Sequence, residues 1–290
     1  MKIFVIGAEG MLGTCLMRVL SQQQWNLVGV GRCILDITNH AQVEQELIKH
    51  KPDVIINASA YTDVERAEVD VVKADAVNNI GVRNLAKVAK KLGALLIHFS
   101  TDYVFDGIKK LPYVESDLPN SLNVYGQTKL AGEVAITEET NKYFIIRTSW
   151  LFAGNSNNFF TKMVGLLQSS AELNVVNDQV GGPTYVNDLA GVVEVILQRY
   201  SQNDFLPWGI YHYAGYPFVS WHAFSSYIQA ALPAQHECIL TPVLSDAYPS
   251  RVKRPLNSCL DSSKIENLLD IKPSNWQMAV KSILAQKDVL

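Results

Sequence analysis

The chain has 290 residues, of which 48% are hydrophobic, and this is enough to bury a sizeable core without stabilisation by a disulfide or a metal ion. Lys and Arg number 25 against 28 Asp and Glu, so the net charge at pH 7 is -3. This near balance argues against nucleic acid as a partner, because proteins that bind nucleic acid carry a basic surface.

The cysteines and the apolar runs bear on the compartment. Four cysteines are scattered without a C-x-x-C pair, which predicts reduced thiols rather than a disulfide framework or a zinc site. The apolar run at 3–6 is too short for a signal peptide, and no later run reaches the roughly 18 apolar residues of a membrane span. We therefore expect a cytoplasmic protein with no membrane partner.

Short apolar runs alternate with longer amphipathic stretches. Nearly unbroken apolar runs are typical of parallel strands buried on both faces, and we expect them at 3–6, 27–30, 54–57, 95–100 and 143–147. Apolar residues spaced three and four apart predict helices at 11–22, 40–50, 77–91, from about 125, at 159–168 and at 187–200. This alternation predicts an α/β fold with a doubly wound, parallel, Rossmann-type sheet.

The alternation weakens after Trp150, where Pro and aromatic residues become more frequent. We therefore expect residues 1–150 to form a dinucleotide-binding domain and residues 151–290 to form a smaller, mainly substrate-binding part that is partly interleaved with the core. No Gly/Ser linker separates the two, which indicates a shared interface with a ligand cleft between them.

A glycine motif, Gly-Ala-Glu-Gly-Met-Leu-Gly at 7–13, follows the first predicted strand and opens the first predicted helix. Small residues there let the backbone approach a pyrophosphate, and the helix N-terminus stabilises its negative charge. A turn made only for strand-helix packing is the alternative, but the position in the first β-α unit favours dinucleotide binding.

The end of the second predicted strand bears on which dinucleotide binds. No acidic residue stands there to accept from a ribose 2'-hydroxyl, whereas Arg32 could pair with a 2'-phosphate. This favours NADPH and leaves NADH as an alternative, since a lone arginine is often only a surface charge. Asp36 could accept from the adenine amino group or could serve as a turn residue, and spacing does not separate the two.

The candidate catalytic residues are Thr101, at the end of a predicted strand, and Tyr125 and Lys129, one turn apart on a predicted helix. Hydride addition to a carbonyl leaves an alkoxide, which needs a proton donor within hydrogen-bond reach. We expect Lys129 to lower the pKa of Tyr125 and Thr101 to hold the carbonyl oxygen beside it. Asn78 is a supporting candidate, which could bond backbone near the site and help to relay a proton.

The residues resemble the extended short-chain dehydrogenases, and more closely the dTDP-4-dehydrorhamnose reductase family, over nearly the whole chain. The matching stretches are 57–62, 64–68, 100–107, 147–150, 178–179, 182–184 and 254–261. The resemblance implies reduction of the 4-keto group of dTDP-4-dehydro-L-rhamnose to dTDP-L-rhamnose by NAD(P)H, with Thr101, Tyr125 and Lys129 as the catalytic triad.

Two further sets of residues follow from the motifs together with the resemblance. The cofactor set is Gly7, Gly10, Met11, Leu12, Gly13, Arg32, Asp36, Ile37, Ala58, Ala60, Tyr61, Thr62, Asn78, Tyr125 and Lys129. The substrate set is Val64, Thr101, Asp102, Tyr103, Tyr125, Trp150 and Arg254, where Trp150 would pack on the sugar and Arg254 would face the diphosphate.

Two alternatives stay open at this point. A few cleft substitutions would redirect the same triad to another nucleotide-linked keto-sugar. The chain could also be a non-catalytic dinucleotide-binding subunit like that of methionine adenosyltransferase, although the stretches at 147–150 and 178–184 look like the reductases. Some relatives dimerise through carboxylate-bound magnesium, but Thr-Cys-Leu at 14–16 offers no carboxylate, so we expect no metal site and either a monomer or a homodimer.

Overall fold

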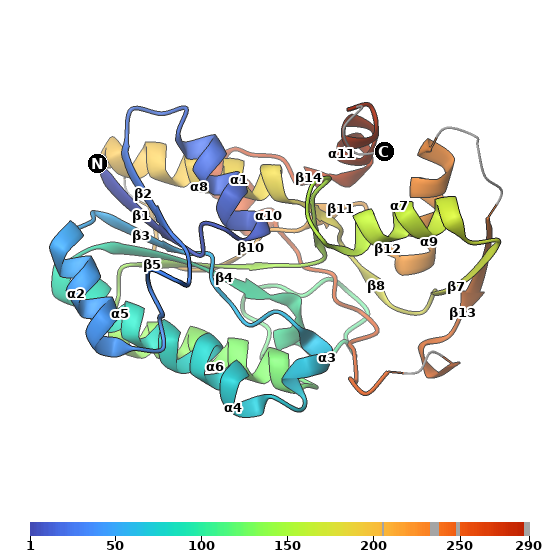
Figure 1. The fold of residues 1–290 in the computed structure, drawn as a ribbon, viewed down its shortest axis with the longest axis horizontal. Coiled ribbons are helices and arrows are strands. Elements are labelled where there is room, and N and C mark those ends of the chain that lie inside the picture. The colour runs from blue at the N-terminus through green and yellow to red at the C-terminus, as the bar shows by residue number, and fades with distance from the viewer. Residues whose placement is uncertain (205, 233–237, 248–249, 287–290) are drawn as a thin grey trace.

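The protein is described by a computed structural model that covers residues 1–204, 206–232, 238–247 and 250–286. These residues build a six-stranded sheet in the order β10-β5-β4-β3-β1-β2, with every neighbouring pair parallel (Figure 1). The strands are β1 (Lys2–Ile6), β2 (Asn26–Val30), β3 (Val54–Asn57), β4 (Leu95–Thr101), β5 (Tyr143–Thr148) and β10 (Gly209–His212). The strand order reverses between β1 and β3, where open parallel sheets bind their ligands.

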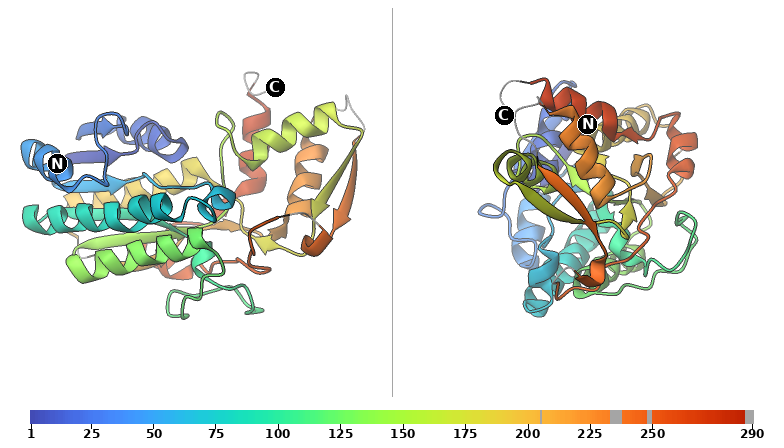
Figure 2. Two further views of the ribbon diagram at one scale, coloured as in Figure 1. Left: turned by 60° about the horizontal axis from the view of Figure 1, so that its bottom comes forward. Right: turned by 90° about the vertical axis from the view of Figure 1, so that its right-hand side faces the viewer.

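Helices cover both faces of this sheet, as the predicted doubly wound arrangement requires (Figures 1 and 2). One face packs against α1 (Met11–Leu20), α8 (Val186–Ser201) and α10 (Ser263–Leu269). The other packs against α2 (His40–His50), α5 (Val82–Leu92) and α6 (Val124–Glu139). The fold class predicted from the sequence is therefore confirmed.

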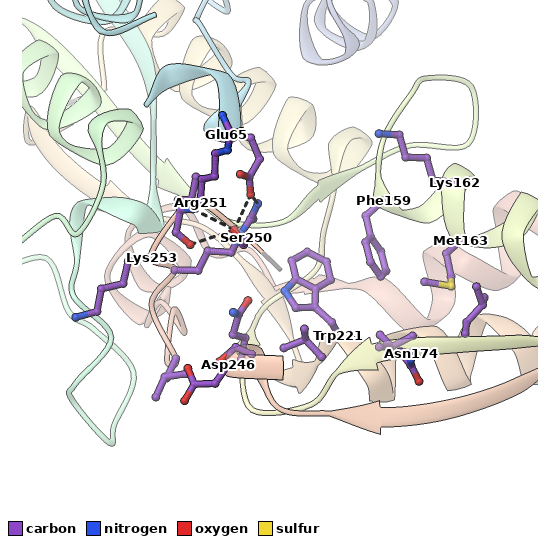
Figure 3. Close-up of a pocket in the computed structure, with 18 of the residues that line it drawn as sticks. Glu65, Phe159, Lys162, Met163, Asn174, Trp221, Asp246, Ser250, Arg251 and Lys253 are labelled. Atoms are coloured by element: carbon purple, nitrogen blue, oxygen red, sulfur yellow. Dashed lines mark hydrogen bonds and ion pairs between the residues drawn. The ribbon is translucent and has the colours of Figure 1, made fainter. Parts of the chain in front are cut away.

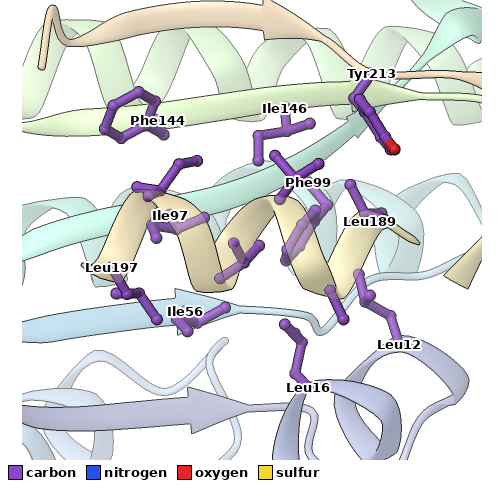
Figure 4. Packing of buried hydrophobic residues seen from close by; sticks show 14 of the residues in the cluster. Leu12, Leu16, Ile56, Ile97, Phe99, Phe144, Ile146, Leu189, Leu197 and Tyr213 are labelled. Carbon is purple, nitrogen blue, oxygen red and sulfur yellow. The ribbon is translucent and has the colours of Figure 1, made fainter. Parts of the chain in front are cut away.

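The apolar core explains why the strands read as unbroken apolar runs. Ile56, Ile97 and Phe144 lie side by side on one face of β3, β4 and β5 and belong to the same buried cluster as Leu189 and Leu197 of α8 (Figure 4). All five side chains are fully buried. Strand residues that point the other way pack against α2 and α5, so both faces of the sheet are buried.

One predicted helix differs from the structure. The stretch 77–91 was expected to be one helix, but α4 (Val71–Asp75) passes into a π-helical segment, η1 (Ala76–Gly81), before α5 begins. The wider turn brings the Asn78 carbonyl against Gly132 of α6, where a Cβ would lie only 2.1 Å from that oxygen. Apolar spacing does not separate a π-helical turn from an α-helical one, so the sequence pattern could not show it.

The later residues form a second, smaller group of elements at one end of the sheet (Figures 1 and 2). Its core lies among α7 (Phe159–Ser169), α9 (Trp221–Ala231), α11 (Trp276–Leu284) and the parallel pair β7 (Glu172–Val176) and β13 (Ile239–Val243). Shorter elements complete the chain: α3 (Val64–Ala67), η2 (Asp102–Val104), β6 (Leu151–Phe152), β8 (Val180–Gly181), β9 (Thr184–Tyr185), β11 (Gly215–Tyr216), β12 (Val219–Ser220), η3 (Ser245–Ala247) and β14 (Ser274–Asn275). Within the described ranges, no helix is long and apolar enough to cross a membrane.

Candidate active site

The glycine motif forms a tight loop between β1 and α1. Gly7 has a φ of +79°, a backbone conformation that other residues adopt only with strain. At Gly13 a Cβ would lie 2.0 Å from the Gly7 carbonyl oxygen, so a side chain there would push α1 away from the loop. Since α1 begins at Met11, its free backbone N–H groups lie in this loop, which fits a pyrophosphate.

Asn78 holds the segment of the predicted cofactor set that follows β3. Its Oδ1 accepts from the Tyr61 backbone N–H at 2.8 Å, and its Nδ2 donates to the Tyr61 carbonyl at 3.0 Å and to Thr128 Oγ1 at 3.1 Å. The side chain is only 1% exposed. These bonds support the predicted contact with backbone. Because they engage both ends of the amide, they do not support a role of the Asn78 side chain in proton relay.

Two charged groups, Arg32 and Asp36, lie in the loop that follows β2. Arg32 is exposed, and its charge helps to lower the pKa of Asp36, although the main cause is the backbone hydrogen bond from Thr38. Asp36 Oδ1 accepts from Thr38 N at 3.0 Å and from Thr38 Oγ1 at 2.8 Å, so Asp36 does serve as a turn residue.

Sequence reasoning missed Glu9, which stands in the middle of the glycine motif. The Glu9 carboxylate packs against Gly31 at the end of β2, where a Cβ on Gly31 would lie 2.1 to 2.3 Å from its atoms. The sequence showed no acid at the end of this strand, but the fold supplies one from the neighbouring loop. No spacing rule for the strand itself could have found it.

The predicted catalytic residues lie at the carboxyl edge of β4 and on the first turns of α6. Asn123 caps α6 by accepting from the Gly126 N–H at 2.9 Å, which fixes the start of the helix that holds Tyr125 and Lys129. Thr101 Oγ1 donates to Asp102 Oδ1 at 2.9 Å, and Thr101 lies near enough to Tyr125 to oppose the rise in the Tyr125 pKa. Thr101 and Tyr125 are therefore in contact, as their proposed roles require.

The electrostatics of Tyr125 differ from the expectation. Burial raises the pKa of Tyr125 above its ordinary value, and among the described residues Lys129 is not one of the groups that shift it. Instead, Lys129 Nζ donates to the Phe99 carbonyl at 2.6 Å and lies 3.2 Å from His98 Nε2. Burial lowers the pKa of Lys129 to about 8. In this arrangement Lys129 does not lower the Tyr125 pKa, because the helix face directs the amine into the sheet, so the predicted effect stays a prediction for the enzyme with its ligands bound.

Asp102 is a buried carboxylate with a free oxygen. Its Oδ2 has no partner of hydrogen-bond geometry among the residues that the structure describes, although the Ser258 hydroxyl is near enough to lower its pKa slightly. Burial has the larger effect and raises the pKa of Asp102 to about 6. A buried acceptor without a partner is unusual, and here it is available to a ligand hydroxyl.

Trp150 lies at the mouth of the site in a strained conformation. Its φ is +46°, and its ring stacks on Trp221 of α9 with ring centroids 3.4 Å apart and an angle of 6° between the planes. A Cβ at Gly181 would lie 2.5 Å from the Trp150 ring, so the glycine makes room for the indole. Strain at a non-glycine residue is typical of functional sites.

A cavity of about 930 Å³ opens beside this tryptophan pair (Figure 3). Arg254 reaches its wall and is held by Tyr103 Oη and Glu65 Oε1, each at 2.9 Å. Apolar and basic side chains supply much of the remaining wall, among them Phe159, Lys162, Met163, Leu173, Trp221, Arg251 and Lys253. Of the predicted substrate residues, Arg254 lines this cavity, whereas Val64 begins α3 directly before Glu65.

The sequence pattern did not single out Phe159 or Arg251. These residues come from segments that are more than 90 positions away from the glycine motif, so only the fold shows that they share a wall. Across the described residues, no group of three or more His, Cys, Asp or Glu could hold a metal ion.

The parallel sheet, the glycine loop at its switch point and the tyrosine–lysine pair define a Rossmann-type dinucleotide-binding protein of the short-chain dehydrogenase kind. The family model described as "RmlD substrate binding domain" matches residues 1–289. The chain belongs to this family, that of the dTDP-4-dehydrorhamnose reductases.

Relatives and solved structures agree with this assignment. The dTDP-4-dehydrorhamnose reductase of Aggregatibacter actinomycetemcomitans is 40% identical over 289 residues, covering 98% of each chain. The crystal structure of the reductase from Bacillus anthracis in complex with NADP has a TM-score of 0.92 and 32% identity and covers 99% of each chain. The structure of the Clostridium acetobutylicum orthologue has a TM-score of 0.91 and 34% identity and covers 98% of this chain and 99% of that one.

Proposed function

We propose that this protein reduces the 4-keto group of dTDP-4-dehydro-L-rhamnose with NADPH to give dTDP-L-rhamnose. The observation that carries the proposal is the match of the whole chain to reductases of that name, together with a hydroxyl and a phenol in contact at the carboxyl edge of the sheet. The reaction is the last step in forming this activated sugar.

The glycine loop at 7–13 would hold the pyrophosphate of the dinucleotide, and the segment 60–62, which Asn78 fixes, would also contact the cofactor. Arg32 pairs with the 2'-phosphate of NADPH, in keeping with the NADP-bound relative. The Glu9 carboxylate near the same strand end supplies an acceptor for a 2'-hydroxyl, so NADH serves as well. The bound dinucleotide supplies the hydride.

The residues of the chain supply the proton and hold the carbonyl. When the substrate binds, the Thr101 hydroxyl turns from Asp102 Oδ1 to donate to the keto oxygen, and the Tyr125 phenol gives its proton to that oxygen as the alkoxide forms. The high pKa of Tyr125 keeps the phenol protonated until then. Burial lowers the pKa of Lys129 to about 8, and only the charged form of this lysine favours the phenolate that is left behind.

The sugar nucleotide enters from the cavity beside Trp150. Arg254 takes the diphosphate in a bidentate arrangement, and Tyr103 and Glu65 fix the direction of its guanidinium. The free Oδ2 of Asp102 accepts from a sugar hydroxyl, and the apolar wall around Trp221 takes the base. We propose that residues 151–290 mainly form this side of the cleft, while residues 1–150 hold the dinucleotide.

The unpaired cysteines fit a reducing compartment, and we place the enzyme in the cytoplasm on that ground. Another nucleotide-linked keto-sugar is the second candidate substrate. The proposed contacts to the base and to the sugar come from different residues, so substitutions could change one set without changing the other. Family membership does not favour the regulatory-subunit alternative.

The test is to mix the purified protein with NADPH and freshly generated dTDP-4-dehydro-L-rhamnose, follow the loss of nicotinamide absorbance and identify the sugar formed. The proposal expects dTDP-L-rhamnose in an amount equal to the NADPH consumed. Tight NADPH binding without oxidation, or oxidation only with a different keto-sugar nucleotide, would overturn it.

A further inference from the structure

His98 is fully buried in β4, directly beside the catalytic lysine, and the mechanism above gives it no task. Its Nε2 lies 3.2 Å from Lys129 Nζ, and its Nδ1 lies 3.1 Å from the Asn57 amide nitrogen. His98 and Asn57 have no exposed surface, and Lys129 is only 2% exposed. The three side chains therefore form a sealed polar row that crosses from β3 through β4 to α6.

The hydrogen bonds fix the direction of this row. Asn57 Oδ1 accepts from the Ser59 backbone N–H at 3.1 Å and from Ser59 Oγ at 2.6 Å. A backbone N–H can only donate, so the atom that it faces is the carbonyl oxygen and the other end of the amide is the NH₂ group. That group donates to His98 Nδ1, which must accept and hence bears no proton.

The charge state of His98 follows from its surroundings. Burial, together with the neighbouring Lys129, holds the pKa of His98 well below its ordinary value, so the ring is neutral. A neutral ring without a proton on Nδ1 has its proton on Nε2. The Nε2–H group therefore points at Lys129 Nζ and donates to it.

An ammonium has no lone pair and cannot accept this bond, whereas an uncharged amine can. The amine still has N–H groups, one of which donates to the Phe99 carbonyl at 2.6 Å. The opposing influence is Glu133 on α6, whose charge favours the ammonium, but Arg147 of β5 binds Glu133 at 2.6 Å and offsets part of that charge.

We propose that His98 is a positioning residue for Lys129: held in one tautomer through Asn57, its Nε2–H donates to Lys129 Nζ and stabilises the uncharged amine. The inference rests on the proposed role of Lys129 in catalysis. It implies that the lysine does not remain a permanent cation and that the basic limb of the pH–rate profile reports its loss of charge.

The tautomer is tested by nitrogen NMR of the full chain labelled with ¹⁵N-histidine. The His98 resonance is assigned by its loss in H98Q, or in H98N if H98Q does not fold. We expect a neutral ring with the proton on Nε2 at pH 9, where Lys129 is uncharged. A proton on Nδ1, or titration of this ring near neutral pH, would overturn the proposal. This readout does not depend on turnover, so it is separable from a failure of the proposed function.

The effect on Lys129 is tested by the pH dependence of kcat. In H98Q the side-chain carbonyl can turn to accept from the ammonium, so the basic limb should move up by about one pH unit. The acid limb should stay at the same pH. The value of kcat at the plateau should change by less than the tenfold that corresponds to one pH unit. The matched control is H212Q, since His212 is also buried but bonds the Tyr113 carbonyl and Arg147. A basic limb that is the same in folded H98Q, H212Q and the unaltered protein contradicts the proposal.

Discussion

Tyr125 is placed to donate a proton because it contacts Thr101 and because burial keeps its phenol protonated. Tyr125→Phe removes the proton but keeps the ring, whose edge packs on Tyr103 with centroids 5.7 Å apart. We expect kcat to fall roughly a hundredfold to ten-thousandfold, the usual contribution of a general acid, while NADPH binding is kept. Single-turnover kinetics and a cofactor titration measure the two; unchanged turnover would refute the assignment.

Arg32 and Glu9 place opposite charges near the end of β2. Arg32→Ala should weaken NADPH binding by roughly tenfold to a hundredfold, the value of a lost bond to a charged group, and should affect NADH much less. Glu9→Gln should act in the reverse direction and raise the preference for NADPH, because it removes a negative charge from that region. The ratio of kcat/KM for the two cofactors measures both, and equal losses with each cofactor in Arg32→Ala would contradict the account.

Asp102 links the site to stability. Since its pKa is about 6 in the folded protein against 3.8 ordinarily, the folded state binds the proton more tightly than the unfolded state does. Stability from this group is therefore present below about pH 4 and is lost as the pH rises to about 6, a change of about 3 kcal/mol. Urea unfolding of the unaltered protein and of Asp102→Asn should show the variant gaining relative stability over this range. Parallel pH curves would show that the carboxyl is not perturbed.

Residues that stand in a motif or at the end of a strand, such as Thr101, Tyr125 and Lys129, could be predicted from the sequence. The side chains that surround them could not. The direction of the Lys129 amine depends on β3 and β4, whose Asn57 and His98 carry no motif. Glu9 was overlooked for the same reason, because its neighbour Gly31 lies 22 positions away in sequence and in contact in space.

At the scale of elements, the contact between η1 and α6 shapes the helix that presents Tyr125. Gly132→Ala would place a Cβ 2.1 Å from the Asn78 carbonyl, where backbone must move, and we expect a loss of about 1–3 kcal/mol of unfolding free energy. Gly165→Ala on α7 is the matched control, since nothing lies within 4 Å of its Cβ, and it should stabilise by up to about 1 kcal/mol. Chemical denaturation measures both variants. An unchanged free energy of unfolding in Gly132→Ala would mean that η1 and α6 do not approach each other this closely in solution.

Periodicity predicted the elements of the sheet well, because buried parallel strands such as β3 and β4 are apolar throughout. It could not predict η1, whose π-helical turn depends on α6, or the two-residue strands of the later chain. Those strands are too short to have a period. Their places depend on pairings such as β12 with β8, which join residues about 40 positions apart.

At the scale of the whole molecule, we propose that the two ligands approach the catalytic edge from different sides. The glycine loop lies at the switch point of the sheet, and the cavity with Arg254 and Trp221 lies among later elements (Figure 3). Late segments also complete the main sheet, since α8 packs on α1 and β10 pairs with β5. This interleaving fixes the position of the later elements relative to the glycine loop. In the proposed mechanism, the nicotinamide and the keto-sugar therefore meet beside Thr101 and Tyr125.

The most direct measurement is the fate of the hydride. NADPH that carries deuterium at C4 of the nicotinamide is allowed to react with dTDP-4-dehydro-L-rhamnose, and the sugar product is analysed by NMR and mass spectrometry. The account predicts one deuterium at C4 of dTDP-L-rhamnose per NADPH oxidised. A product without deuterium at that carbon, or cofactor bound without any transfer, would contradict the claim that this edge of the sheet is a carbonyl-reducing site.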